Sequence, residues 1–511
     1  MLKKVFSSIY TLLLFSMILY FLCGCSSKKN AHSNTLFTLL PASETGVDFS
    51  NQIVYTEEYN PYTFRNFFNG GGVAIGDINN DGLADIFFCS NQHSNKLYLN
   101  KGNFKFEDIT DKAGLNSDGV WSSGVTMADV NGDGLLDIYV CKSGNLESRK
   151  RNNELFINNG NLTFTDKAKE FGLDSKGLST HAVFFDADND GDLDCYLLNN
   201  SFRSVGNYDL IKDQRNIRDT LGGNKFFHND GDRFIDVTEK SGIYSSNIGF
   251  GLGVNAADIN NDGWQDIYVS NDFFERDYLY INNHDGTFTE SLEKYIQETS
   301  MNSMGADIAD INNDGLPEIY VTDMLPEDDA RIKTKTTFEN WDKYQSDISN
   351  GYYKQFVRNS LQLNDGFSPS PPGGGRGEVS FSEIGRLAGV CATDWSWGAL
   401  IADLDNDGRK DIFVANGIFK DITDQDYIQY ANDAYENIRQ DIINKKKNIL
   451  KSLIDKIPSN PVSNYAFHNN GDLTFTNKAK EWGLDEKGFS NGSAYGDLDN
   501  DGDLDLVVNN V

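Results

Sequence analysis

Short hydrophobic runs recur along the chain in pairs, and an Asp-rich polar loop separates the two members of each pair. The run before a loop contains many small residues, as in 72–76 and 398–402, and the run after it contains β-branched and aromatic residues, as in 86–88 and 412–414. Runs of this length and composition, bounded by Asp, Asn and Gly, are typical of β-strands. Each pair therefore predicts a β-hairpin.

A second hairpin follows in six of these units, on Asn-Gly or Asp-Gly turns that supply the positive φ a tight turn needs. Two hairpins give four antiparallel strands per unit, and the unit repeats seven times. The pattern predicts an all-β fold, a seven-bladed β-propeller of four-stranded antiparallel blades with helical insertions. A row of independent β-domains is the alternative, which the absence of Pro/Ser linkers disfavours.

The seven polar loops share the form D-x-[DN]-x-D-G-x-x-[DE], and the first two begin 52 residues apart, at Asp77 and Asp129. Oxygen side chains at loop positions one, three, five and nine resemble the spacing of an EF-hand, with the closing carboxylate at position nine instead of twelve. Asp and Asn favour turns in any case, but seven such loops in register indicate calcium, since carboxylates this close repel one another without a cation. We predict up to seven structural Ca²⁺ ions.

The predicted ligands are the residues at positions one, three, five and nine of the loops, of which the fifth ends unusually in Pro-Glu. They are Asp77, Asn79, Asp81, Asp85, Asp129, Asn131, Asp133, Asp137, Asp186, Asp188, Asp190, Asp194, Asp258, Asn260, Asp262, Asp266, Asp310, Asn312, Asp314, Glu318, Asp403, Asp405, Asp407, Asp411, Asp497, Asp499, Asp501 and Asp505.

The formal net charge is −31, which argues against nucleic acid as a partner and favours cations.

At the N-terminus, residues 1–25 combine two lysines with a short apolar run and end at Cys25. This segment resembles a bacterial lipoprotein signal peptide acylated at Cys25, with a plain secretory signal as the alternative. Residues 26–35 are then a tether and residues 36–511 the propeller. The lipid anchor, which would be the only membrane attachment, predicts an extracytoplasmic protein of the bacterial cell envelope, held at the outer membrane.

The two ends of the repeat region suggest how the ring closes. Residues 36–49 resemble the fourth strand and link of a unit, whereas the sequence stops after the second strand of the seventh unit. We expect the N-terminal strand to complete the seventh blade, whose third strand is missing, and the last blade to be incomplete at the C-terminus.

The loops and their flanking strands resemble the FG-GAP/VCBS repeat of integrin-α-like propellers. Residues 322–327 (TDMLPE) and 416–421 (NGIFKD) are similar to the bacterial lipoproteins of the cartilage-acidic-protein type that are associated with an ASPIC/UnbV domain. The resemblance implies an extracytoplasmic module for binding or adhesion.

Three insertions, 201–223, 324–358 and 418–463, interrupt the repeat and are the expected places for specificity. The second contains Trp341, Tyr344, Tyr352 and Tyr353, a candidate platform for stacking carbohydrate; the alternative is that they pack an inserted helix. The third has Ile443, Ile449, Leu450, Leu453 and Ile457 spaced for one helix face.

No triad, Walker loop or dinucleotide fingerprint is present in the sequence. We therefore predict a non-catalytic, calcium-binding scaffold for adhesion or for binding an unknown protein or glycan. The alternative is a polysaccharide-active lyase or hydrolase that uses the mouth of the propeller channel.

Overall fold

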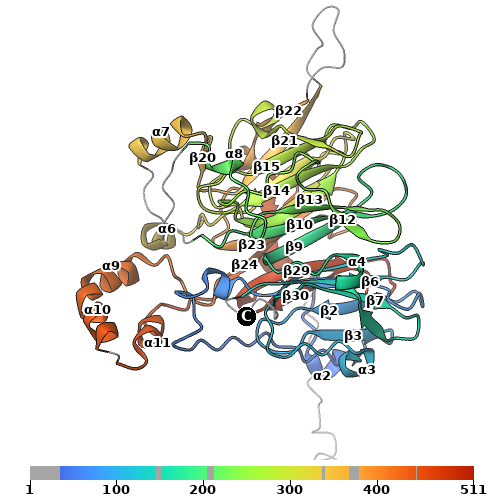
Figure 1. Cartoon of the computed structure of the whole chain (residues 1–511), viewed down its shortest axis with the longest axis horizontal. Coiled ribbons are helices and arrows are strands. Elements are labelled where there is room, and N and C mark those ends of the chain that lie inside the picture. The colour runs from blue at the N-terminus through green and yellow to red at the C-terminus, as the bar shows by residue number, and fades with distance from the viewer. Residues whose placement is uncertain (1–34, 145–150, 204–211, 336–339, 368–378, 445) are drawn as a thin grey trace, which may run out of the picture.

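The computed structural model describes residues 35–144, 151–203, 212–335, 340–367, 379–444 and 446–511. These residues form six four-stranded antiparallel sheets, each a blade with its strands in sequence order from the centre outward, and a further two-stranded hairpin (Figure 1). The six blades are β1 (Val73–Gly76), β2 (Asp85–Phe88), β3 (Lys96–Asn100) and β4 (Phe106–Asp108); β5 (Ser122–Ala128), β6 (Asp137–Lys142), β7 (Glu154–Asn158) and β8 (Phe164–Asp166); β9 (Leu178–Phe185), β10 (Asp194–Asn200), β11 (Lys225–Asn229) and β12 (Phe234–Asp236); β13 (Gly251–Ala257), β14 (Asp266–Asn271), β15 (Tyr278–Asn282) and β16 (Phe288–Glu290); β18 (Ala306–Ala309), β19 (Glu318–Val321), β21 (Ser360–Phe367) and β22 (Val379–Glu383); and β23 (Ser396–Ala402), β24 (Asp411–Asn416), β26 (Tyr465–Asn469) and β27 (Phe475–Asn477).

The seventh hairpin pairs β29 (Ser490–Gly496) with β30 (Asp505–Asn510). The innermost strands contact one another in the circular order β1, β5, β9, β13, β18, β23, β29 and back to β1. The predicted propeller is therefore confirmed, and its ring is closed by contact between the first and last hairpins.

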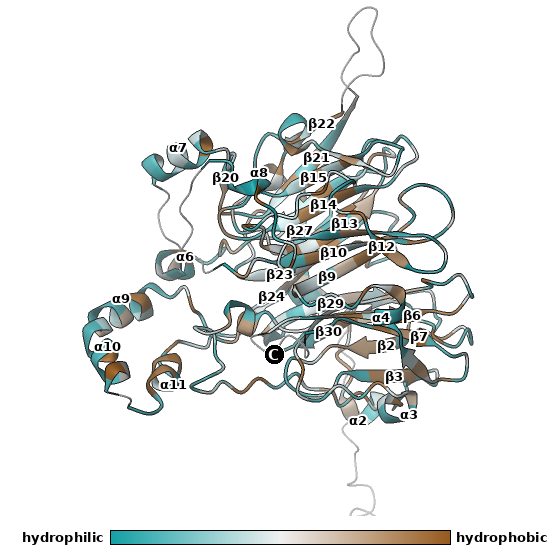
Figure 2. Ribbon diagram, viewed as in Figure 1, coloured by the Kyte–Doolittle hydropathy of each residue, from teal (hydrophilic) through white to brown (hydrophobic). Residues whose placement is uncertain are grey.

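The second strand of each complete blade is buried along its whole length, which explains its continuous hydrophobic run. Buried aliphatic and aromatic side chains fill the spaces between neighbouring blades, and the hydrophobic colour in Figure 2 follows the strands. The innermost strands approach so closely that a β-carbon on Gly124 would lie 2.3 Å from the carbonyl oxygen of Thr180 in the next blade. Only glycine fits such a position.

The prediction of seven four-stranded blades is wrong: the described residues form six, and no third strand among them pairs with β30. The expected N-terminal strand is also not formed, since it would need that third strand as its neighbour. Phe37 nevertheless occupies the corresponding place, because its carbonyl oxygen lies 2.6 Å from the position of a β-carbon on Gly483. The carbonyl oxygen of Phe234, in the fourth strand of a complete blade, lies at the same distance from the position of a β-carbon on Gly172. Phe37 therefore stands where a fourth-strand residue stands in a complete blade.

Short helices link successive blades, and several end at a glycine in the left-handed conformation, such as Gly114 and Gly172. The short helices are α2 (Ala42–Thr45), α3 (Thr110–Ala113), α4 (Ala168–Phe171), α5 (Leu292–Tyr295), α8 (Gly385–Ala388) and α12 (Ala479–Trp482). The link that ends at Gly242 is a turn, whereas the one that ends at Gly389 is helical.

The insertions carry the longer helices, which stand together on one side of the blades, at the left of Figure 1. They are α6 (Asp329–Lys335), α7 (Trp341–Ser349), α9 (Gln425–Asp433), α10 (Tyr435–Ile443) and α11 (Ile449–Ile454). Leu453 and Ile457 are buried as expected, but Ile443 is 60% exposed because it lies at the end of α10, away from the blades. Two small sheets lie beside the insertions, β17 (Thr299–Ser300) with β20 (Gln355–Phe356) and β25 (Val462–Ser463) with β28 (Lys487–Gly488).

Candidate metal loops

Each Asp-rich loop follows an innermost strand and folds around the carboxylate at position one. In the first loop Asp77 accepts hydrogen bonds from the backbone N–H of Asp81, at 3.2 Å, and of Gly82, at 2.7 Å. The same two bonds recur in the other six loops. Position six is a glycine with positive φ in every loop, which explains the Asp-Gly step of the motif.

The residue at position four of each loop also shapes the turn, a role that the motif did not predict. It is Asn in six loops and Gly in one, always with positive φ, which Asn tolerates better than most residues. Several of these amides also reach the neighbouring loop: Asn80 donates to the carbonyl of Gly134 at 2.9 Å, and Asn500 donates to the carbonyl of Gly82 at 2.8 Å. The loops therefore contact one another around the ring, including across its closure.

In the six complete blades the position-nine carboxylate lies buried beneath the loop. In the first blade Asp85 accepts from the backbone N–H of Ile78, at 3.0 Å, and from that of Asn100 in the third strand, at 2.7 Å. It thus joins the first hairpin of the blade to the second. Burial raises the pKa of Asp85 to about 6, and the corresponding carboxyl has a pKa raised to about 6 or 7 in every other loop. A buried carboxylate with a raised pKa is stabilised by a nearby cation.

Glu318 replaces Asp at position nine of the fifth loop without disturbing it. Its side chain is fully buried, and its Oε2 accepts from the N–H of Ile311 at 2.8 Å, as the aspartates do in the other loops. The irregular sequence of this loop therefore leaves its geometry intact.

Six asparagines of the third strands, the clasp asparagines, hold adjacent blades together; five end their strands and one lies within β21. They are Asn100, Asn158, Asn229, Asn282, Asn364 and Asn469. The side-chain N–H₂ of each donates to a carbonyl at position two of the loop in the preceding blade and to a second carbonyl in its own blade. From the sequence these residues were predicted only as turn formers, although their recurrence in all six second hairpins was a signal for a further role.

The loops bring together the carboxylates expected to bind metal. In the third, sixth and seventh loops, which have Asp at position three, three carboxylate oxygens lie within 4.8 Å of one another. In the first loop, position three is Asn79, which donates to Asp81 at 3.0 Å. The first, second, fourth and fifth loops therefore place two aspartates and an amide in the corresponding arrangement.

Several buried oxygen atoms in the loops accept no hydrogen bond from the described residues. They are Asp188 Oδ1, Asn260 Oδ1, Glu318 Oε1, Asp405 Oδ1 and Asp499 Oδ1. Four of these oxygens belong to position three and that of Glu318 to position nine. Buried acceptors are normally paired, so unpaired oxygens in five loops fit a hard cation that binds through oxygen.

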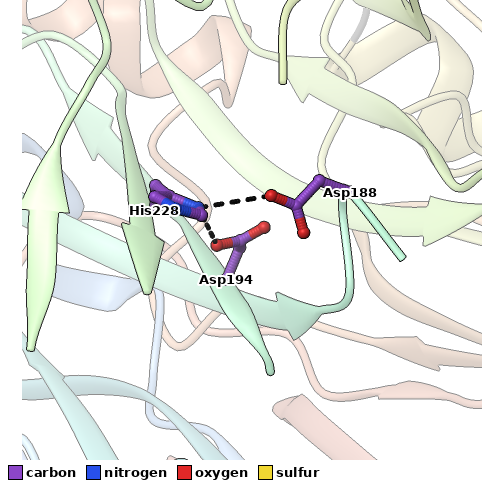
Figure 3. A group of neighbouring side chains, drawn as sticks. All are labelled: Asp188, Asp194 and His228. Carbon is purple, nitrogen blue, oxygen red and sulfur yellow. Dashed lines mark hydrogen bonds and ion pairs between the residues drawn. The ribbon is translucent and has the colours of Figure 1, made fainter. Parts of the chain in front are cut away.

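Histidines stand beside two of these clusters. In the third blade, His228 Nδ1 lies 3.1 Å from Asp194 Oδ1 and 3.7 Å from Asp188 Oδ2, and Figure 3 shows the imidazole turned toward both carboxylates. In the sixth blade, His468 Nδ1 lies 3.1 Å from Asp405 Oδ2.

The structure does not gather the four predicted aromatic residues into one exposed platform. Trp341 is 69% exposed and stacks on Tyr344 with ring centroids 5.5 Å apart, but Tyr352 is only 4% exposed. The hydroxyl of Tyr353 donates to the carbonyl of Ile296. Of the four predicted residues only Trp341 is exposed, whereas Tyr344 and Tyr353 are half-buried.

The ends of the innermost strands away from the loops are covered by a hydrophobic cluster, the aromatic cap. It joins residues that precede or begin these strands to the third insertion: Phe64, Phe67, Phe68, Trp121, Met304, Trp395, Trp397, Ile418, Tyr427, Leu453, Ile454 and Ile457. The Nε1–H of Trp397 donates to the carbonyl of Gly417 at 2.7 Å. A channel-mouth active site at this end would have to displace a packed core.

Cys25 and the rest of the predicted signal peptide lie outside the described residues. Among the helices that the structure does describe, none has the length and apolar character needed to cross a bilayer.

Sequence comparison finds the FG-GAP-like repeat at residues 77–140, 258–321 and 454–508, which include the first, second, fourth, fifth and seventh loops. Cartilage acidic protein 1 of Xenopus tropicalis is 33% identical over 171 residues, which cover 32% of this chain and 25% of that protein. Integrin alpha-3 of Mus musculus is 32% identical over 99 residues, covering 17% of this chain and 9% of that protein. The chain thus carries FG-GAP repeats and is homologous, over part of its length, to both proteins.

Among solved structures, an Agrocybe aegerita lectin that recognises non-reducing terminal N-acetylglucosamine aligns over 88% of each chain with a TM-score of 0.40 and 14% identity. The V. cholerae biofilm matrix protein Bap1 aligns over 61% of this chain and 39% of that one, with a TM-score of 0.30 and 16% identity.

Proposed function

We propose that this FG-GAP-repeat propeller is a calcium-stabilised, non-catalytic scaffold that displays its helical insertions for adhesion or ligand binding. The observation that carries the calcium assignment is the set of unpaired buried oxygens in five loops. Four of these oxygens belong to position three of the loop and one to position nine. A divalent cation at each loop would satisfy these oxygens and neutralise the aspartates around them.

Calcium suits these loops because six of the seven offer oxygen donors from three aspartates or two aspartates and an amide, together with the position-nine Asp. Calcium accepts six to eight oxygen ligands in flexible geometry, at about 2.3–2.6 Å. The ion would connect positions one, three and five, on the loop, to position nine, which is bonded to the third strand. It would therefore stabilise the joint between the two hairpins of a blade, and its binding would add to the free energy of unfolding.

The adhesion role is supported by the partial homology to cartilage acidic protein 1 and integrin alpha-3. The insertions stand on the side of the propeller away from the Asp loops, and α7 presents Trp341, stacked on the half-buried Tyr344, to solvent. Acylation at Cys25, with the following residues as a tether, would hold the propeller at the envelope surface and leave this side free for a protein or glycan.

Metal analysis and thermal unfolding test the calcium assignment. The full chain, dialysed against Ca²⁺, should retain up to seven ions, and chelation with EDTA should lower Tm by many degrees. Asp258→Asn, at position one of the fourth loop, should remove one ion. Asp285→Asn, in an exposed turn of the same blade, is the matched control and should remove none. Absence of bound Ca²⁺, with a Tm that EDTA does not change, would refute the assignment.

A glycan array and binding to extracellular-matrix proteins test the adhesion role. We expect saturable binding that is lost in Trp341→Ala when Tm is unchanged. Release of reducing sugars or of unsaturated products from a polysaccharide would refute the non-catalytic assignment.

A further inference from the structure

Two of the clasp asparagines are preceded by histidine, and the other four are preceded by an aliphatic residue. His228 and His468 occupy the positions held elsewhere by Leu99, Ile157, Ile281 and Leu363. The two blades with histidine are also the only complete blades with Asp at position three of the loop, where the others have Asn. The imidazole and the additional carboxylate therefore occur together.

The third strand brings each imidazole against its own loop. Ligand atoms of Asp188, Asp194 and His228 lie within 4.8 Å of one another, as do those of Asp405, Asp407 and His468. The side chains converge from the loop, the second strand and the third strand, as Figure 3 shows for the third blade. One nitrogen and several carboxylate oxygens thus face a common point.

A simple ion pair between His468 and Asp405 would produce an aligned hydrogen bond. His468 Nδ1 lies 3.1 Å from Asp405 Oδ2 and 3.4 Å from Asp411 Oδ1, yet it is buried and makes no hydrogen bond with the described residues. The neighbouring Asp405 Oδ1 is also buried without a partner. Close atoms that are not aligned with one another are the arrangement expected of ligands directed at a shared ion. In the third blade His228 Nδ1 does hydrogen-bond with Asp194 Oδ1, so there the convergence of the three side chains carries the inference.

We propose that the loops of the third and sixth blades bind a first-row transition-metal dication, of the class of Zn²⁺, in preference to calcium. Imidazole nitrogen suits such metals, whereas carboxylate, amide and water suit calcium. For metal–ligand distances of about 2.1 Å, two ligands at 90–110° stand about 3.0–3.4 Å apart. Three of the four His–Asp separations, 3.1, 3.1 and 3.4 Å, fall in this range, and the fourth is 3.7 Å. The inference rests on the proposed function only in requiring that the loops bind divalent cations.

Metal content and Co²⁺ absorption test this inference on the full chain. After dialysis against Zn²⁺ with millimolar Ca²⁺, the protein should retain two Zn²⁺ ions in addition to Ca²⁺, and Co²⁺ should give visible absorption in their place. The double variant His228→Leu and His468→Leu should lose both Zn²⁺ ions and the absorption. Its Ca²⁺ content should not fall, because leucine is the residue that the first and fifth blades carry at this position.

His284→Leu is the matched control. His284 approaches a single carboxylate of the fourth loop, Asp262, at 2.9 Å, and this variant should keep both Zn²⁺ ions. Zn²⁺ retained by a folded double variant would overturn the inference, because the ions would then be held by carboxylates alone. Bound Ca²⁺ without bound Zn²⁺ would overturn it and leave the proposed function standing. Absence of both metals would overturn both.

Discussion

Replacing Asn158 by alanine removes three hydrogen bonds, one of which joins two blades. Its side-chain N–H₂ donates to the carbonyl of Ile78 in the preceding blade, at 2.7 Å, and to that of Leu136, at 3.1 Å. Its Oδ1 accepts from the N–H of Gly160 at 3.0 Å, and the residue is 4% exposed. At about 0.5–1.5 kcal/mol for each bond, the variant should lose about 3 kcal/mol of stability.

The expected change in Tm follows from the size of the propeller. An unfolding entropy of about 2.1 cal/mol/K per residue gives about 1 kcal/mol/K for a domain of this length, so Asn158→Ala should lower Tm by about 3 °C. Differential scanning calorimetry of the calcium-loaded protein measures this shift. Asn158→Asp should lose at least as much, because it would place a buried carboxylate oxygen against the two carbonyl oxygens that the amide now serves.

The adjacent Asn159 provides the matched control. It is exposed, and its amide pairs only with the hydroxyls of Thr163 and Thr165. Asn159→Ala should therefore change stability by less than about 0.5 kcal/mol, as exposed substitutions usually do. Equal Tm shifts for the alanine variants at 158 and 159 would refute the role assigned to the clasp asparagines.

Burial raises the pKa of the seven position-nine carboxyls above their ordinary values, so the metal-free folded protein binds protons more tightly than the unfolded chain. Its Tm in EDTA should therefore fall as pH rises from about 4 to about 7. In calcium, Tm should instead rise with pH, because the bound ion favours the ionised carboxylates. Parallel Tm–pH profiles in EDTA and in calcium would contradict this expectation. Gly305→Ala places a β-carbon 2.4 Å from the carbonyl oxygen of Trp397 and should lower stability by about 1–3 kcal/mol in thermal melts, more than Gly398→Ala, whose nearest contact is a flexible side chain at 3.3 Å. Trp397→Ala, in the aromatic cap, should cost about 3–5 kcal/mol by the same measurement, whereas the exposed Trp341→Ala should cost less than about 0.5 kcal/mol; equal costs would show that the cap is not a packed core.

The loops could be read from the sequence because their geometry depends on side chains within nine residues. Asp at position one and Gly at position six act locally, so their spacing predicted the turn in all seven loops. The role of position nine was predicted incompletely. Asp85 was expected to close a metal shell, and its hydrogen bond to the N–H of Asn100 depends on how a later hairpin packs.

The features that the sequence did not predict depend on contacts between distant segments. Asn-Gly turns explained Asn158 fully as a turn residue, so nothing local indicated that its amide reaches Ile78. Tyr352 and Trp341 belong to the same aromatic-rich segment, and only the packing of α7 decides that one is buried and the other exposed. The number of complete blades likewise depends on whether a third strand is present to pair with β30.

The closure of the ring has a consequence for the order of folding during synthesis. Core residues of the first blade, Ile86 and Phe88, pack against Leu498 and Val507 from the last hairpin, and Asn100 donates to the carbonyl of Leu498. These partners are translated about 400 residues later. The first blade must therefore leave one hydrophobic face uncovered until the ribosome has made the last hairpin, and this face is where a chaperone would bind the nascent protein.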